Sequence, residues 1–267
     1  MVGRTLWTAF FAAFVLFIYG PVVTIVVLAF GGPESGLTFP MRGVSLHWFA
    51  ELFTTQNVGD LGASFRRSAA LAAMVAIVTV LVSVAAAFAF RRPFFGRRTL
   101  FTLALASMIV PSILVSLGVG LVFSQTGLDP AWYSSAFGAQ LTWALPFGLL
   151  IMSAVLNRFD TRWEEAARDG GATPWQTTRH VMLPILAPPI IGLGLFGFTL
   201  SWDEFARTLL TAGSDNTLPL EIYGMTTNVT SPVLYALGAA TTGISLLAIA
   251  AGLVAVGRLT RLRAPRS

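Results

Sequence analysis

The chain has 267 residues, of which 55% are hydrophobic and only 11% are charged, and its formal net charge at pH 7 is +5. A soluble domain needs more polar side chains to cover its surface, so this composition predicts an integral membrane protein. The chain has no cysteine and no lysine, which excludes thiolate metal sites, a Walker A loop and Schiff-base chemistry. The two histidines lie far apart, without ligand spacing, and we expect no metal and no cofactor.

Six apolar stretches are long enough to cross a bilayer as helices. A helix rises 1.5 Å per residue, so about 20 apolar residues cross roughly 30 Å of hydrocarbon. The first stretch has signal-peptide features, but it is too long and lacks a cleavage pattern, so we interpret it as a retained span. The fold predicted is therefore all-α, a single transmembrane domain over 1–267 with spans at 6–30, 68–90, 100–123, 140–156, 185–210 and 235–257.

The distribution of arginine predicts the orientation, because short cytoplasmic loops are enriched in basic residues. With the amino terminus inside, three arginines fall on the outer side and Arg207 falls near the end of the fifth predicted span. The cytoplasmic side then holds Arg4, Arg91, Arg92, Arg97, Arg98, Arg158, Arg162, Arg168, Arg179, Arg258, Arg261, Arg263 and Arg266. Both termini are therefore predicted to be cytoplasmic. Topology accounts for the basic excess, and no nucleic-acid partner is expected.

Two of the predicted loops have internal structure. The outer loop 31–63 contains one short amphipathic piece at 46–53. The longest cytoplasmic loop, 157–184, favours a helix at 162–168, is interrupted by two glycines, and resumes as a helix at 174–182. Thr173 is a suitable N-cap in front of a proline in the first turn. The cytoplasmic loop is thus predicted to form two short helices joined at a glycine hinge.

The cytoplasmic loop also carries a family signature. The run EAARDGGATPWQTTRHVMLP, from Glu165 to Pro184, matches the EAA signature of ABC importer permeases: Glu-Ala-Ala, glycine after three residues, and, nine residues later, an aliphatic residue followed by one residue and Leu-Pro. Val181 stands where isoleucine is usual. The resemblance extends over about 64–256, and WALPFGLLIMSAVLNRFD, SWDEF and TLPLEIYGMTTNVTSPVLYALGAATT resemble the spermidine/putrescine branch.

The resemblance implies a type I ABC importer permease, a subunit without catalytic activity in a bacterial inner membrane. Its implied partners are two cytoplasmic ATP-binding subunits, a second permease of different sequence and an extracytoplasmic substrate-binding protein. In this family the signature loop docks in a groove of the ATPase. By position, the resemblance assigns the ATPase contact to Glu165, Ala166, Ala167, Gly171, Leu183 and Pro184. The two alanines would allow close approach, and Gly171 would set the angle between the helices.

One cluster of ionisable residues falls on a predicted span, in SWDEFAR near the outer end of the fifth. Asp203 and Glu204 beside Trp202 are suited to an amine cation, attracted by charge and by the ring face. Alternatively, both acids are interfacial and are satisfied by Arg207, at i+4 and i+3 on one helix. Arg207 also departs from the resemblance, because the polyamine branch has an apolar residue there.

The sequence therefore does not identify the cargo. The resemblance implies a polyamine such as spermidine or putrescine, and the alternatives are an opine, an amino-acid derivative, a phosphonate or ferric iron. An ion-coupled secondary transporter is the alternative of a different class. That class needs ionisable residues near the middle of the membrane, and the first four predicted spans contain no such acid.

Overall fold

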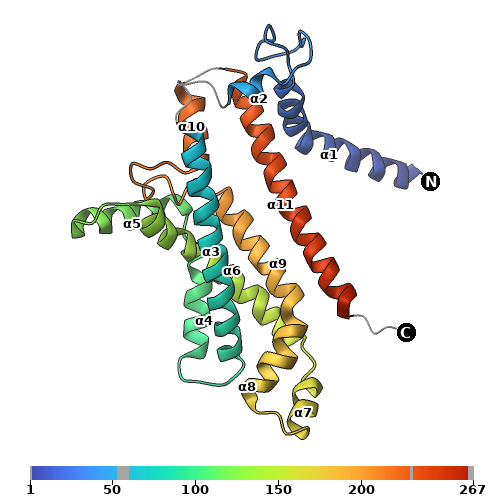
Figure 1. The fold of residues 1–267 in the computed structure, drawn as a ribbon, viewed down its shortest axis with the longest axis vertical. Coiled ribbons are helices and arrows are strands. Elements are labelled where there is room, and N and C mark those ends of the chain that lie inside the picture. Colours follow the sequence, from blue (N-terminus) through green and yellow to red (C-terminus); the bar gives the residue numbers. More distant parts are fainter. Residues whose placement is uncertain (1, 53–59, 229–230, 264–267) are drawn as a thin grey trace. The chain divides into compact units, whose positions relative to one another are not determined.

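The computed structural model describes residues 2–52, 60–228 and 231–263 (Figure 1). The regular structure of these residues is helical, apart from one isolated bridge between Gly31 and Val44. The chain divides into two compact units. Unit 1 comprises Met1–Leu61 and Glu221–Leu247, and unit 2 comprises Gly62–Leu220 and Ala248–Ser267.

Unit 1 contains two helices from the amino-terminal part of the chain and parts of the last two helices. The elements that contribute to it are α1 (Val2–Ala29), α2 (His47–Glu51), part of α10 (Leu218–Asn228) and the first half of α11 (Val233–Arg263). The Tyr235 hydroxyl of α11 donates to the Leu37 carbonyl oxygen at 2.7 Å. The predicted amphipathic piece at 46–53 is confirmed as α2, although residue 53 lies outside the described residues. Most large apolar side chains of α1 are exposed, as expected for a surface that contacts lipid or another subunit.

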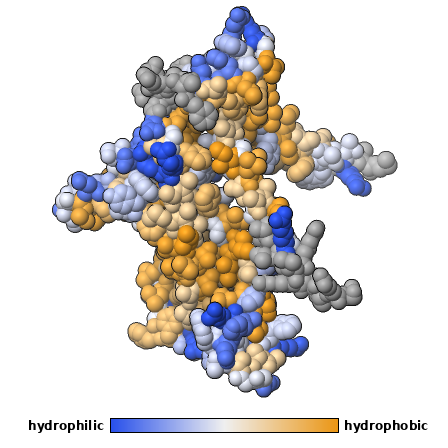
Figure 2. Space-filling view, in the orientation of Figure 1, coloured by the Kyte–Doolittle hydropathy of each residue, from blue (hydrophilic) through white to orange (hydrophobic). Residues whose placement is uncertain are grey.

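Unit 2 is a bundle in which α6 packs along α9. Its elements are α3 (Leu61–Phe90), α4 (Arg97–Ala106), α5 (Ser112–Thr126), η2 (Trp132–Ala136), α6 (Phe137–Asn157), α7 (Arg162–Asp169), α8 (Pro174–Thr177), η3 (Thr178–Met182) and α9 (Leu183–Trp202). Residues of α3, α6, η3 and α9 form its core: Ala87, Met152, Leu156, Met182, Leu186 and Leu193. Figure 2 shows hydrophobic residues gathered on the surface of this unit and hydrophilic residues at the end that carries α7 and α8.

Small residues allow the helices of unit 2 to approach closely. A Cβ atom at Gly148 of α6 would overlap the Ser83 hydroxyl of α3 and lie 2.9 Å from a methyl group of Thr79. A Cβ atom at Gly197 of α9 would lie 3.3 Å from Cα of Ala76, also on α3. Helix α3 is therefore in close contact with both α6 and α9.

Among the described residues, five helices are long and apolar enough to cross a membrane: Arg4–Ala29, Leu61–Phe90, Trp132–Asn157, Pro174–Trp202 and Val233–Val254. Each overlaps one predicted span. The predicted span at 100–123 is divided into two helices, because α4 ends at Ala106 and α5 begins at Ser112. Pro111 has an extended backbone, with ψ at 133°. It also lacks an N–H group and disfavours helical geometry at the residue before it.

The fifth predicted span, 185–210, is also different in the structure. Helix α9 ends at Trp202, and the next eight residues form turns and irregular backbone. The Glu204 carboxylate accepts the backbone N–H of Arg207 at 2.9 Å, and the Thr208 hydroxyl donates to the Glu204 carbonyl at 2.8 Å. Such local bonds compete with the bonds of a helix. The placement of residues 203–207 on the helix of this span is therefore wrong.

The close contact between α3 and α6 predicts an effect of one added methyl group. We expect Gly148→Ala to lower the free energy of unfolding by about 1 to 3 kcal/mol, because the crowding involves both Ser83 and Thr79. Gly138→Ala is the matched control on the same helix, where the new methyl group meets no described atom within 4 Å. Denaturant unfolding of the purified chain in detergent measures both. Equal stability of Gly148→Ala and the parent would contradict this packing.

Candidate functional site

The segment 157–184, which we call the coupling segment, begins with helix α7 and a glycine break. Helix α7 ends at Asp169 with Gly170 as its C-cap, and Gly171 follows with φ at +83°, in the left-handed region that glycine adopts readily. Thr173 then caps α8. Its hydroxyl accepts the Gln176 N–H at 3.3 Å, and its own N–H donates to the Gln176 side chain at 2.8 Å. The predicted cap is confirmed, and the predicted break after the first helix lies at Gly170 and Gly171.

The second half of the coupling segment differs from the prediction. Residues 174–182 do not form a separate short helix, because α8, η3 and α9 follow one another without a break over the 29 residues Pro174–Trp202. The wider π-helical turn of η3 ends at Met182, two residues before Pro184. A proline ring clashes with the carbonyl group four residues earlier in an α-helix, and a π turn gives it room. The coupling segment therefore runs directly into the following apolar helix.

An ion pair fixes α7 to the end of α3. The Glu164 carboxylate lies 2.6 Å from the Arg91 guanidinium and 3.8 Å from that of Arg168, one turn further along α7. The Glu164 side chain is only 12% exposed. Its position in the first turn of α7 also suits the positive end of the helix dipole. Sequence reasoning missed this pair because its two residues are 73 positions apart in the chain.

The opposite side of α7 is open. Glu165 and Ala166 are exposed, as are two tryptophans of the segment, Trp163 at 58% and Trp175 at 66%. Gly171 is exposed as well, whereas three other residues of the signature are partly buried: Ala167, Leu183 and Pro184. Tryptophan is enriched at protein interfaces, so these exposed rings suit a surface that contacts a partner. From the sequence, Trp175 is expected on an apolar edge against the membrane-side helices, but its ring is exposed.

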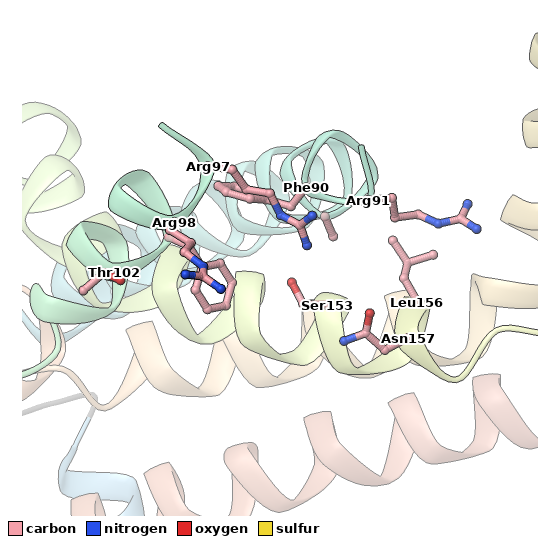
Figure 3. A pocket seen from close by; sticks show the side chains of 10 residues that line it. Phe90, Arg91, Arg97, Arg98, Thr102, Ser153, Leu156 and Asn157 are labelled. Carbon is pink, nitrogen blue, oxygen red and sulfur yellow. The ribbon is translucent and has the colours of Figure 1, made fainter. Parts of the chain in front are cut away.

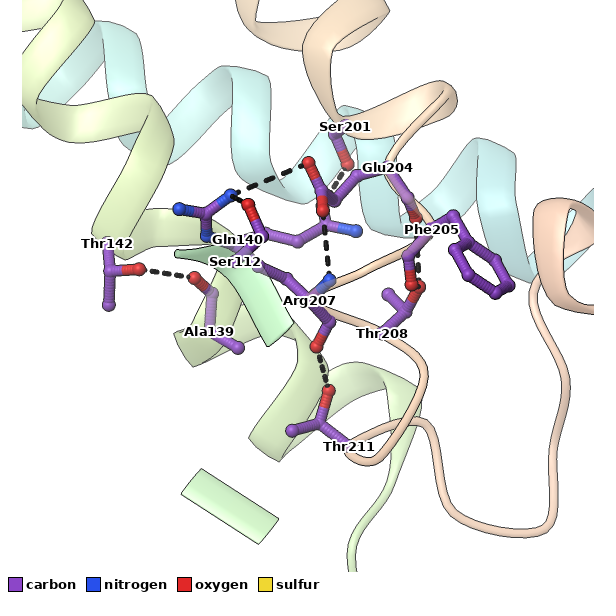
Figure 4. Close-up of polar contacts among 10 residues, drawn as sticks. All are labelled: Ser112, Ala139, Gln140, Thr142, Ser201, Glu204, Phe205, Arg207, Thr208 and Thr211. Atoms are coloured by element: carbon purple, nitrogen blue, oxygen red, sulfur yellow. Dashed lines mark hydrogen bonds and ion pairs between the residues drawn. The ribbon is translucent and has the colours of Figure 1, made fainter. Parts of the chain in front are cut away.

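A second polar feature is the cluster around Arg207, which we call the buried arginine cluster (Figure 4). The Arg207 side chain is 0% exposed. Its guanidinium group donates to the Ser112 hydroxyl at 2.6 Å, lies 3.7 Å from the Glu204 carboxylate, and stacks over the Trp143 ring at 4.4 Å from its centroid. Arg207 therefore ties residues 203–210 to α5 and α6.

The other residues of the SWDEFAR run are separated by the turn after α9. Trp202 is buried, with its ring 5.2 Å from Phe65 and 5.9 Å from Phe198, measured between centroids. Asp203 is exposed, and among the described residues only Glu204 forms an ion pair with Arg207. The prediction that both acids share Arg207 along one helix is wrong. Of these four residues, only Asp203 has an exposed side chain.

Comparison with known proteins shows the family to which the chain belongs. The sequence pattern of the binding-protein-dependent transport system inner membrane components matches residues 79–261, which include the whole coupling segment. The chain belongs to this family. The result agrees with the recognition made from the EAA signature.

The chain is also similar to individual transport proteins. It is 28% identical over 252 residues to the spermidine/putrescine transport system permease protein PotC of Escherichia coli (strain K12), with 94% of each chain covered. It is 27% identical over 228 residues to the putrescine transport system permease protein PotI of the same strain, covering 83% of this chain and 80% of that one. A solved bacterial alginate ABC transporter, in complex with an alginate pentasaccharide-bound periplasmic protein, has a chain with the same fold. The TM-score is 0.65 at 14% identity, with 95% of this chain and 92% of that chain covered.

The buried arginine cluster predicts a loss of stability when its charge is removed. We expect Arg207→Met to lower the free energy of unfolding by about 3 kcal/mol, because Glu204 keeps a largely buried charge without its partner. The double change Arg207→Met with Glu204→Gln should recover much of that loss. Arg179→Met, at an exposed position of η3, is the control and should change stability by less than about 0.5 kcal/mol. Denaturant unfolding in detergent measures the stability of the parent and the three variants. If Arg207→Met were as stable as the parent, the cluster would not contribute to the stability of the fold.

Proposed function

We propose that the chain is the transmembrane permease subunit of an ABC importer in the inner membrane of a bacterial cell, and that it forms half of the translocation path. The observation that carries this proposal is the EAA run, whose Glu165 and Ala166 are exposed on a helix anchored to the bundle. In this proposal two cytoplasmic ATP-binding subunits hydrolyse ATP. A second permease of different sequence completes the path, and an extracytoplasmic binding protein delivers the cargo. The periplasmic protein bound to the alginate transporter supports the last partner.

The proposed topology has six crossings with both termini in the cytoplasm. Five long apolar helices alone would place the termini on opposite sides of the membrane. We infer that α4 and α5 together make the third crossing, which restores an even number. The excess of arginine on the predicted cytoplasmic side supports this assignment. On this topology the coupling segment faces the ATP-binding subunits, and the core permease module covers about 64–256.

Coupling is proposed to work through the exposed side of α7. Ala166 leaves room for a close approach of the ATPase backbone, Glu165 offers a hydrogen-bond acceptor, and Gly171 sets the angle between α7 and α8. The continuous helix Pro174–Trp202 then transmits the displacement over about 43 Å, at 1.5 Å per residue. A device of this kind works only if its contacts with the ATPase differ between the two states of the transporter. Ala167, Leu183 and Pro184 are proposed to support the docked geometry from partly buried positions.

The cargo is proposed to be a polyamine or a related small amine. The names of the two Escherichia coli relatives support this class. Asp203 is proposed as the cation contact because it is exposed, whereas Trp202 and Arg207 are buried and serve as positioning residues. Because Glu204 lies 3.7 Å from Arg207, it offsets the arginine charge locally. The negative charge of Asp203 then stays available, which removes the objection that Arg207 repels a polycation.

The coupling proposal predicts uncoupling when the hinge is changed. Gly171→Val forces a β-branched residue into a left-handed backbone, so the angle between α7 and α8 should change. We expect the assembled transporter to lose at least tenfold of the ATP hydrolysis that is stimulated by cargo-loaded binding protein, with the chain still inserted in the membrane.

Gly127→Val is the matched control for this experiment. Gly127 has φ at +70°, and, like Gly171, it has no described atom within 4 Å of an added Cβ. It lies at the end of α5, away from the coupling segment. We expect this control to keep stimulated hydrolysis. Normal stimulation of ATP hydrolysis in Gly171→Val, or an equal loss of that stimulation in Gly127→Val, would overturn the proposal that the coupling segment contacts the ATPase.

The cargo proposal predicts a dependence on the Asp203 charge. Asp203→Asn should weaken uptake of radiolabelled putrescine or spermidine by about tenfold or more, because one charge-assisted contact contributes about 1.5 to 3 kcal/mol. Asp129→Asn removes an exposed negative charge from the same predicted side and should transport like the parent. Uptake by cells that lack other polyamine importers measures both. Unchanged polyamine uptake in Asp203→Asn would exclude Asp203 from the cargo path.

A further inference from the structure

The turn between α3 and α4 has a sequence that the proposed transport function does not explain. It reads RRPFFGRR, from Arg91 to Arg98, so that two pairs of arginine enclose two phenylalanines. Gly96 adopts φ at +80° and allows the tight reversal into α4. The Phe95 side chain is fully exposed and that of Phe94 is 41% exposed. Adjacent exposed aromatic rings with flanking cations are typical of a segment at a membrane surface.

A cavity of about 570 Å³ lies beside this turn, between α3, α4 and α6. Its apolar walls include two phenylalanine rings, and its polar groups come from α4 on one side and α6 on the other. Figure 3 shows Arg97 and Arg98 extending from α4 toward α6, where Ser153 and Asn157 lie. The described lining residues are Ala87, Phe90, Arg91, Arg97, Arg98, Phe101, Thr102, Ser153, Leu156 and Asn157.

The cavity carries a positive charge that the described residues do not balance. Arg91 is paired with Glu164, but neither Arg97 nor Arg98 forms an ion pair within the described part of the chain, and none of the described lining residues is acidic. Both arginines also occupy the first turn of α4, where the helix dipole disfavours a cation. Neighbouring like charges repel each other as well. An anion bound in the cavity would offset all of these costs.

We propose that this cavity binds the phosphate group of an anionic phospholipid. Arg97 and Arg98 contact the phosphate, Ser153 and Asn157 offer donors to the rest of the headgroup, and Phe94 with Phe95 rest at the edge of the hydrocarbon layer. The exposed rings favour a lipid over free phosphate, because free phosphate makes no use of apolar surface. The assignment to the cytoplasmic leaflet rests on the proposed topology. That leaflet carries the anionic lipids that attract polybasic segments.

Native mass spectrometry of the full chain in detergent tests the proposal, with phosphatidylglycerol as the probe and phosphatidylcholine as the neutral comparison. We expect selective binding of phosphatidylglycerol, and a tenfold or greater loss of that affinity in the double variant Arg97→Gln with Arg98→Gln. Arg158→Gln with Arg179→Gln is the matched control, because it removes two exposed charges that neither line the cavity nor belong to the RRPFFGRR run. The control should stay within twofold of the parent.

Two further measurements distinguish binding of a lipid from binding of a free anion. Phe94→Ala with Phe95→Ala should weaken phosphatidylglycerol binding although all arginines remain, and inorganic phosphate at equal concentration should not displace the lipid. Parent-like lipid affinity in the Arg97/Arg98 variant, an equal loss in the control, or displacement by inorganic phosphate would each overturn the proposal. The measurement needs neither ATPase, binding protein nor cargo, so its failure is distinct from a failure of the transport proposal.

Discussion

The ion pair between Arg91 and Glu164 is the contact on which the proposed coupling depends. It joins Arg91, the residue that follows α3, to the first turn of α7 at 2.6 Å, with the Glu164 side chain largely shielded from solvent. Because Glu164 is held on one side of a short helix, its neighbours Glu165 and Ala166 are exposed on another. A helix of eight residues has little stability of its own. The ion pair therefore holds the orientation in which the signature is presented.

Two further features connect this helix to the distant end of the bundle. The break at Gly171 separates α7 from a helix that is continuous from Pro174 to Trp202. At its far end, Arg207 ties the following turn to α5 and α6 through Ser112 and Trp143. A displacement at the hinge can therefore reach the turn that carries the proposed cargo contact. The packed interior between these points favours a rigid movement over local deformation.

The features predicted correctly from the sequence are those that local physics determines. Hydropathy identified five of the long apolar helices, and backbone conformation with capping chemistry identified the break at Gly171 and the cap at Thr173. The errors lie where tertiary contacts or local side-chain bonds decide. The bonds around Glu204 ended α9 early, and Pro111 divided one apolar stretch into two helices. The contact of Arg207 with Trp143 joins residues 64 positions apart, so no periodicity could reveal it.

The central claim is that α7 docks on an ATPase, and site-specific crosslinking in cells tests it most directly. A photo-reactive amino acid at Ala166, and another at Gly127 as the comparison, would each be irradiated in intact cells and the products identified by mass spectrometry. The account predicts a product at Ala166 that joins this chain to a subunit containing a nucleotide-binding P-loop, and no such product at Gly127. A transport-competent chain that gives no ATPase product from Ala166 would contradict the account.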